Sequence, residues 1–248
     1  MQEWLLTEVG GSSIQTAQRD ASGRFWFTPG LVRETDRPIA LACPGLIRSG
    51  SVLYATNLGW PDQADPREEL GLQTISLVEN DVVAASLGES LLRSTTRPER
   101  DLFYVSLGTG VGSAQVLGGI ASDLNLGHRF VGGTIYCSGC RSVGCLNAYL
   151  CSSHLPTPLA EHDQVFVAQT LARAFQSMSL NEQFLLVLGG GMVRCYPKLI
   201  SLVQEQIANP VEMTAAPALA KSAAYAGLDY LSRLQRSKLC CNEVYLNQ

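Results

Sequence analysis

One histidine and three cysteines of this chain lie close together in the sequence, at His128, Cys137, Cys140 and Cys145. Three thiolates and one imidazole are the ligand set of a closed tetrahedral zinc site, and the glycines between the cysteines allow tight turns. A disulfide framework would be unusual in a chain of this size without a secretion signal. The remaining alternative is a set of buried free thiols beside a core histidine. The cluster predicts a structural zinc ion.

Glycine-rich turns follow three apolar stretches of the chain. They are Gly10-Gly11 with Ser12 after them, Gly108-Thr109-Gly110, and Gly189-Gly190-Gly191. Successive N–H groups in such a turn form a nest that suits phosphate oxygens, and glycine lets the backbone come close to them. One such turn would indicate only a tight connection, but three indicate phosphate-binding loops around a common crevice. None of them has the Gly-Lys-Ser/Thr of a P-loop or a dinucleotide fingerprint.

Asp81 is the carboxylate best placed for acid–base chemistry. It follows an expected strand, and residues 82–92 behind it have the apolar spacing of a helix with one buried face. A carboxylate at the top of a helix and beside a strand end can accept the proton of a substrate hydroxyl. The alternative is that Asp81 only caps the helix at Val82.

The composition argues against several classes of protein. The 248 residues contain 18 Lys and Arg and 22 Asp and Glu, which gives a net charge of −4. An acidic balance of this kind argues against a basic surface for nucleic acid. No run reaches the roughly 18–20 apolar residues of a membrane helix. The first residues show no basic segment and no long apolar core, so we expect a cytoplasmic protein without membrane or nucleic-acid partners.

Strands and helices alternate along the chain. Strands are expected at residues 3–9, 37–43, 51–55, 72–78, 101–107 and 183–188, and a hairpin or meander at residues 14–27 with its turn at residues 20–23. Helices are expected at residues 82–92, 165–178, 198–207 and 219–234. This alternation predicts an α/β fold with sheets that are at least partly parallel.

Taken in order, these motifs resemble those of the ROK family of sugar kinases and sugar-responsive repressors. That family is part of the actin-like, hexokinase-like ATPase superfamily. Residues 8–13 are similar to its first phosphate loop, residues 79–81 with Gly88-Glu89 to its catalytic segment, and residues 107–112 to its second phosphate loop. Residues 42–45, 50–52 and 57–60 resemble its sugar-binding lobe, residues 126–128 and 140–146 its zinc segment, and residues 189–191 its adenosine loop.

The resemblance covers nearly the whole chain and implies a two-lobed, actin-like and ribonuclease H-like ATPase fold with mixed sheets and helices. We expect an N-terminal lobe at residues 1–100, with the first phosphate loop, part of the sugar site and the catalytic segment. A C-terminal lobe at residues 101–248 would hold the second phosphate loop, the zinc loop and the adenosine loop. The resemblance also suggests a homodimer.

The resemblance also assigns roles to individual residues. Asp81 would be the general base. The substrate site would comprise Pro44, Gly45, Asn57, Asn80, Asn125, His128 and Asn147. Mg-ATP would be bound by Glu8, Gly10, Gly11, Ser12, Gly108, Thr109, Gly110, Gly190 and Gly191. Glu8 would stand near Mg²⁺ and the phosphates, although an acid at a strand end has the same appearance in sequence. The zinc ion would fix the loop that presents His128 to the sugar.

The zinc segment departs from the family pattern at its start. Ser138 stands where the family has its first cysteine, so Cys137 must reach the metal through a turn relaxed by one residue. Cys151 is an alternative ligand.

The sugar site departs further, because Asn125 and Asn147 stand where the family has glutamates. A carboxylate accepts hydrogen bonds from sugar hydroxyls, whereas an amide both donates and accepts. We therefore expect the preferred ligand to differ from an ordinary glucose-like hexose, unless a neighbouring side chain supplies the missing acceptor.

Two classes of function follow. The first is a kinase that transfers the γ-phosphoryl group of ATP to a hydroxyl of a sugar or sugar-like polyol, with polyphosphate as another conceivable donor. The second is a catalytically impaired relative that binds a sugar, a nucleotide or a partner without phosphoryl transfer. The residues Asn80-Asp81 favour the first class, and loss of the two glutamates favours the second.

Overall fold

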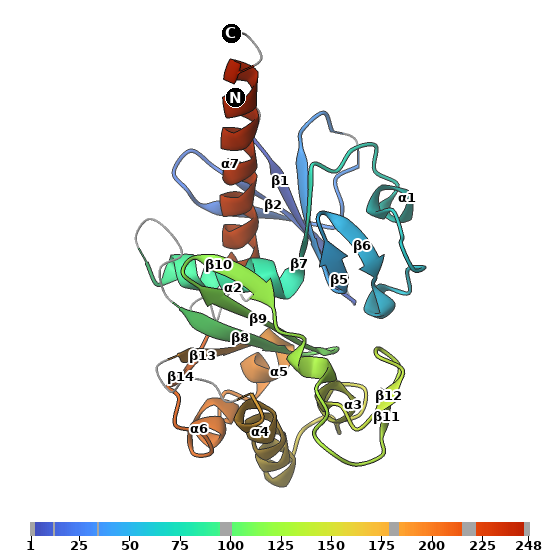
Figure 1. The fold of residues 1–248 in the computed structure, drawn as a ribbon, viewed down its shortest axis with the longest axis vertical. Coiled ribbons are helices and arrows are strands. Elements are labelled where there is room, and N and C mark those ends of the chain that lie inside the picture. Colours follow the sequence, from blue (N-terminus) through green and yellow to red (C-terminus); the bar gives the residue numbers. More distant parts are fainter. Residues whose placement is uncertain are drawn as a thin grey trace.

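Two five-stranded sheets form the two halves of the molecule, one above the other in Figure 1. The computed structural model describes residues 3–11, 13–33, 35–94, 101–178, 184–214 and 222–245, with side chains described to residue 235. The first sheet has the order β3-β2-β1-β4-β7, with bounds Phe25–Pro29, Ile14–Arg19, Leu5–Val9, Ile39–Cys43 and Leu77–Asn80. The second has the order β10-β9-β8-β13-β14, with bounds Ile120–Asp123, Val111–Leu117, Leu102–Leu107, Leu185–Gly189 and Val211–Met213.

The two sheets share one pattern of strand directions. β1 pairs antiparallel with β2 and parallel with β4, which is parallel to β7. β8 pairs antiparallel with β9 and parallel with β13, which is parallel to β14. The predicted α/β class with mixed sheets is confirmed by this topology.

Strand β8 is buried on both faces, which explains its largely apolar sequence. Phe103 and Val105 pack with residues of α4 (Glu161–Gln176) and α6 (Leu199–Gln204). Leu102 and Tyr104 point to the opposite face, where they pack with residues of α2 (Asp81–Leu92). Figure 1 shows α4 and α6 below the second sheet and α2 between the two sheets.

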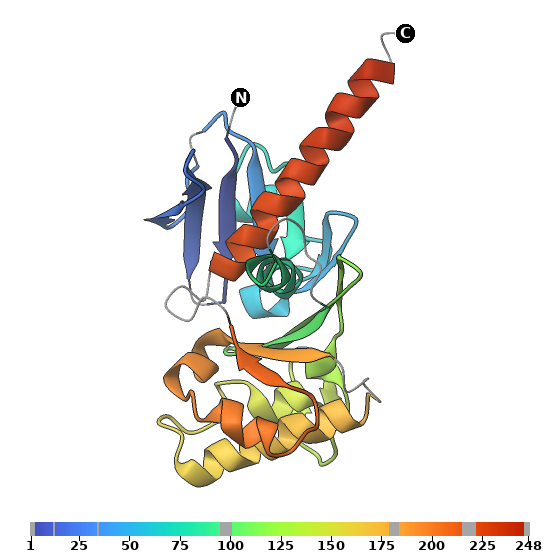
Figure 2. The same cartoon turned by 90° about the vertical axis from the view of Figure 1, so that its left-hand side faces the viewer.

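The helix α2 is crossed at close range by the last helix, α7 (Ser222–Tyr245) (Figure 2). A Cβ atom at Gly88 would lie 1.6 Å from the carbonyl oxygen of Ala223, so only glycine permits this approach. The same region holds Glu89, whose buried carboxylate pairs with Arg93 and accepts the hydroxyl of Thr214 after β14. These contacts join α2 to both halves of the molecule.

Short elements complete the described chain. They are β5 (Leu46–Arg48), β6 (Ser51–Tyr54), the 3-10 turns η1 (Thr56–Leu58) and η2 (Leu126–His128), α1 (Pro66–Leu70), β11 (Tyr136–Cys137), β12 (Ser142–Val143), α3 (Leu146–Leu150) and α5 (Gly190–Cys195). The strand expected at residues 72–78 is wrong at its start, because only its last two residues lie in β7. The lobe boundary expected at residue 100 lies outside the described residues and stays a prediction.

Candidate active site and metal centre

One cleft between the two halves of the molecule is lined by the loops that follow β1, β4, β7, β8 and β13. Its volume is about 530 Å³. Of the residues that we assigned to the substrate and the nucleotide, these line it: Glu8, Gly10, Gly11, Pro44, Gly45, Asn57, Asn80, Asp81, Gly108, Thr109, Gly110, Asn125, His128, Asn147, Gly190 and Gly191. Ser12 lies outside the described residues. The structure therefore brings the assigned residues together, although it does not test the role of each one.

The three glycine turns approach one another within this cleft. A Cβ atom at Gly11 would lie 3.5 Å from Cγ2 of Thr109, so the loop after β1 touches the loop after β8. A Cβ atom at Gly108 would lie 3.9 Å from the backbone nitrogen of Gly191, so the loops after β8 and β13 are also neighbours. Backbone N–H groups from both halves can thus face one ligand, as a nucleotide polyphosphate requires.

Gly190 occupies the sharp turn from β13 into α5. Its φ is +89°, and a Cβ atom there would lie 2.3 Å from the carbonyl oxygen of Leu107. Only glycine fits such a position. The adenosine-loop motif is therefore required by the backbone itself, and the turn leads directly into a helix that sequence analysis did not predict.

Asp81 is the first residue of α2 and lines the cleft. Burial raises the pKa of its carboxyl to about 6, and the negative charge of Asp123 adds to the shift. Its Oδ1 accepts the N–H of Val82 at 2.9 Å, which opposes that shift. A carboxylate with a pKa near 6 is a stronger base than an exposed aspartate and is still ionised at neutral pH.

Asn80, rather than Asp81, is the N-cap of α2. Its Oδ1 accepts the N–H groups of Val82 and Val83 at 2.9 and 3.1 Å. Its Nδ2 donates to the carbonyl oxygen of Gly45 at 2.8 Å. Asn80 thereby links the end of β7 to the loop after β4, and it leaves the neighbouring carboxylate of Asp81 in the cleft.

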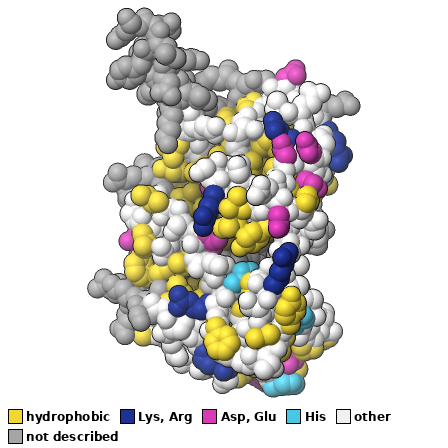
Figure 3. Space-filling view, turned by 45° about the vertical axis from the view of Figure 1, so that its right-hand side comes forward, with side chains coloured by type: hydrophobic (Ala, Val, Ile, Leu, Met, Phe, Trp, Pro, Cys, Tyr) yellow, Lys and Arg dark blue, Asp and Glu magenta, His cyan; other side chains and the backbone are white. Residues whose placement is uncertain are grey.

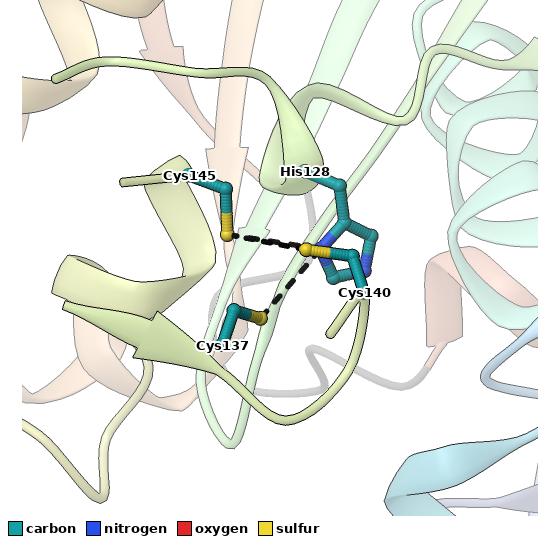
Figure 4. Close-up of side chains that lie close together, drawn as sticks. All are labelled: His128, Cys137, Cys140 and Cys145. Atoms are coloured by element: carbon teal, nitrogen blue, oxygen red, sulfur yellow. Dashed lines mark hydrogen bonds between the residues drawn. The ribbon is translucent and has the colours of Figure 1, made fainter. Parts of the chain in front are cut away.

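The four predicted metal ligands form one cluster, shown in Figure 4. Nδ1 of His128 lies 3.8 Å from Sγ of Cys137 and 3.9 Å from Sγ of Cys145, and Sγ of Cys140 lies 3.7 Å from that of Cys145. A tetrahedral zinc ion with Zn–S bonds of about 2.3 Å needs sulfur atoms about 3.8 Å apart. The spacing and the donor set therefore both fit zinc.

In the structure Cys137, and not Cys151, joins the metal cluster. Cys137 reaches the other ligands although Ser138 holds the expected position, whereas Sγ of Cys151 contacts Oγ of Ser153 instead. Burial lowers the pKa of His128, which favours the neutral imidazole that binds metals.

The two asparagines at expected glutamate positions differ in their surroundings. Asn147 uses both ends of its amide inside the protein: Oδ1 accepts the N–H of Val111 at 2.8 Å, and Nδ2 lies 3.4 Å from Sγ of Cys137. Asn125 has a φ of +51° in the left-handed region, where asparagine is favoured over most other residues. Its N–H donates to the carboxylate of Asp123.

Sequence analysis missed several residues that also line the cleft, among them Arg48, Tyr54, Thr56, Asp123 and Arg194. Arg48 ends β5, Asp123 ends β10 and Arg194 lies in α5. No motif marks them, because each reaches the cleft through the pairing of its strand or the turn of a short helix. In the sequence, the one feature that could have indicated them is a polar side chain close to a recognised motif.

The face shown in Figure 3 carries acidic, basic and apolar side chains in a scattered arrangement, with no basic patch. None of the helices in the described part of the chain is long and apolar enough to cross a membrane.

Comparison with known proteins supplies the family relationship. The ROK family model matches residues 31–185, which is more than half of the chain. A search of curated proteins finds no significant match.

Solved structures share the fold. The Streptomyces griseus ROK family glucokinase, in complex with glucose and AMPPNP, has a TM-score of 0.70 and 17% identity, covering 91% of this chain and 98% of its own. The ROK hexokinase from Thermus thermophilus has a TM-score of 0.62 and 22% identity, covering 94% and 99%. A ROK family transcriptional regulator, a homologue of the E. coli MLC protein, has a TM-score of 0.59 and 20% identity, covering 92% and 80%. These likenesses show that the chain shares the fold of these ROK family proteins.

Proposed function

The chain belongs to the ROK family, and from that premise we propose that it transfers the γ-phosphoryl group of ATP to a hydroxyl of a sugar or sugar-like polyol. In this reaction the hydroxyl oxygen forms a bond to the γ-phosphorus, and the bond from that phosphorus to the β–γ bridging oxygen breaks. The hydroxyl proton passes to a base, and ADP leaves. The observation that carries the proposal is one cleft that combines three glycine loops with the half-buried carboxylate of Asp81.

Asp81 is the proposed general base. A pKa of about 6 makes the carboxylate a stronger proton acceptor than an ordinary aspartate and still leaves it mostly ionised at neutral pH. Asn80 holds this geometry by capping α2 and by bonding to Gly45, which also lines the cleft. We assign Asn80 a positioning role for that reason, beside the substrate contact that the family resemblance implies.

The residues on the nucleotide side of the cleft fit a Mg-nucleotide. The glycine loops after β1, β8 and β13 would hold the phosphates through N–H groups, and the hydroxyl of Thr109 adds a donor. Glu8 would stand beside Mg²⁺, which prefers oxygen ligands and neutralises charge on the phosphates. Arg194 lines the same part of the cleft and offers a further positive charge. ATP and polyphosphate share the phosphate chemistry on which this assignment rests.

Zinc has a structural role in this proposal. His128 belongs to both the metal cluster and the cleft lining, so the bound ion would hold its imidazole beside the substrate. The homodimer and the cytoplasmic location stay predictions, as does the absence of a nucleic-acid partner.

The second candidate is a ROK-type protein that binds a sugar or nucleotide without catalysis. Asn147 favours it, because an amide engaged with Val111 and Cys137 no longer offers a carboxylate to the substrate. A transcriptional regulator also stands among the similar structures.

The deciding experiment measures ADP release with ATP or polyphosphate as donor against glucose, mannose, N-acetylglucosamine, N-acetylmannosamine and myo-inositol. The kinase proposal expects sugar-dependent turnover that is lost in Asp81→Asn. Calorimetry on the same panel separates the second candidate, which expects sugar or nucleotide binding without turnover. Turnover that survives Asp81→Asn would overturn the assigned base.

A further inference from the structure

We propose that Asp123 is the carboxylate that accepts hydrogen bonds from substrate hydroxyls, in place of glutamates at positions 125 and 147. This inference rests on the proposed function, because it requires a sugar or polyol in the cleft. It adds a specificity-determining residue that has no counterpart among the motifs of the sequence. It also supplies the acceptor whose loss led us to expect a ligand unlike glucose.

The strand β10 carries Asp123 into the cleft. Asp123 is its last residue and pairs with Ala114 of β9, whose neighbour Ser113 lines the same cleft. The Oγ of Ser113 accepts the N–H of Leu126, and its carbonyl oxygen accepts the N–H of Leu124. The segment that holds Asp123 is therefore tied to β9 on both sides of residue 125.

One oxygen of Asp123 orders the turn, and the other remains for a ligand. Oδ1 accepts the N–H of Asn125 at 2.7 Å, which fixes the rotamer of the carboxylate. Among the described residues no hydrogen bond to Oδ2 is found. An ionised carboxylate has about four acceptor positions, so it can bind adjacent hydroxyls while it retains the backbone bond.

Asp123 lines the same cleft as the proposed base Asp81 and the imidazole of His128. Its negative charge also contributes to the raised pKa of Asp81. The shared cleft therefore allows one hydroxyl-bearing ligand to contact both carboxylates.

The backbone explains why the carboxylate stands at position 123. The residue at position 125 has left-handed φ, which asparagine adopts more readily than glutamate does. Position 147 is also closed to a ligand, because the amide of Asn147 is bonded to Val111 and Cys137. The described residues that line the cleft include three carboxylates, Glu8, Asp81 and Asp123. Because Glu8 is assigned to Mg²⁺ and Asp81 to the proton, Asp123 is the one left to bind substrate hydroxyls.

The test compares Asp123→Asn, Asp123→Glu and the control Asp101→Asn. Asparagine keeps an oxygen for the N–H of Asn125, so the fold of the turn is retained. Asp101 is a matched control, because its Oδ1 accepts the N–H of Gly118 at 2.8 Å and it lies outside the cleft. Melting temperatures of all variants check that the fold is intact.

The measurements are the KM for ATP and for the best acceptor among glucose, mannose, N-acetylglucosamine, N-acetylmannosamine and myo-inositol. Asp123→Asn should raise the acceptor KM roughly 10- to 100-fold, the size expected for a charged hydrogen bond. The KM for ATP should stay within about twofold. Asp123→Glu should restore part of the loss, and Asp101→Asn should change neither constant.

Each outcome has a defined meaning. An acceptor KM that stays within about twofold in Asp123→Asn, or an equal rise in the KM for ATP, overturns the inference and leaves the kinase proposal standing. If the wild type binds an acceptor without turnover, the kinase proposal fails, and calorimetry with the same variants decides the role of Asp123. A wild type that binds no member of the panel overturns both.

Discussion

Asn147 connects the metal cluster to the loop after β8 through its two amide atoms. Its Nδ2 lies 3.4 Å from Sγ of Cys137, and its Oδ1 accepts the N–H of Val111 at 2.8 Å. A Cβ atom at Gly110 would lie 3.0 Å from the same Oδ1, so the amide packs directly against the glycine loop. Asn147 therefore couples the metal cluster directly to the proposed phosphate loop.

The first prediction concerns this link. Asn147→Ala should destabilise the protein by about 1–3 kcal/mol, because the buried N–H of Val111 loses its partner. It should raise the KM for ATP more than that for the acceptor, since the loop after β8 is displaced. Thermal unfolding and steady-state kinetics measure the two effects.

Asn209→Ala serves as a control for that variant, because Asn209 bonds to the carbonyl oxygen of Phe184 and lies outside the cleft. A rise confined to the acceptor KM in Asn147→Ala would contradict the link and would return Asn147 to the substrate site.

The second prediction is about one zinc ion per chain, measured by elemental analysis of protein purified without chelator. Cys140→Ser should lose the metal and unfold at lower temperature, because the energy of metal binding is part of the folding energy. Cys151→Ser should retain it, since Sγ of Cys151 faces Ser153. Cys195→Ser is the exposed control. Protein that contains no zinc, or loss of zinc in Cys151→Ser alone, would contradict the assigned ligands.

Much of the fold could be predicted because buried positions carry apolar residues, which are visible in the sequence. The strand expected at residues 101–107 is apolar except for Asp101 and Ser106, since both of its faces are covered by helices. The error at residues 72–78 has the same origin. Leu72 is buried in the loop after α1, where its N–H donates to Arg67, and not in a strand. An apolar residue predicts that its side chain is buried, but it does not predict whether the residue lies in a strand, a helix or a loop.

The candidate site could be predicted only where a motif marks it. The glycine loops and Asp81 are visible because tight turns and helix starts restrict residue type. Asp123 carries no such mark, because it reaches the cleft through the register of β10 on β9. The hydrogen bonds of Asn147 could not be predicted from the sequence either, because its partners Val111 and Cys137 lie 36 and 10 residues before it in the chain.

The third prediction separates catalysis from stability at Asp81. Asp81→Asn should reduce turnover by roughly 10²–10⁴-fold, because the proton acceptor is lost. It should also stabilise the protein at pH 8 by about 3 kcal/mol, since burial penalises the charged carboxylate and an amide oxygen can still accept the N–H of Val82. Chemical denaturation of both proteins at pH 8 measures the difference. A variant that is both inactive and less stable would indicate a structural role instead.

The fourth prediction is the pH dependence of turnover. Burial raises the pKa of Asp81 to about 6, and the charge of Asp123 adds to the shift. Because only the ionised carboxylate accepts a proton, kcat/KM should rise with pH, reach half of its maximum near pH 6 and become level above about pH 7. The contribution of Asp81 to the free energy of unfolding changes with pH in the opposite direction to turnover. Between the usual aspartate pKa of about 4 and the raised value, the folded chain retains a proton that the unfolded chain releases, so the contribution of Asp81 falls as pH rises.

The variant Asp123→Asn tests the cause of that profile. Removal of the like charge favours the ionised form of Asp81, so its pKa should fall and the rise of kcat/KM should move to lower pH. Asp101→Asn, with its carboxylate outside the cleft, should leave the profile in place. The rates are measured from pH 4.5 to 8.5 in buffers of constant ionic strength, which keeps screening between the two carboxylates equal. A profile that stays level down to about pH 4.5 in the wild type would show that the pKa of the catalytic base is not raised.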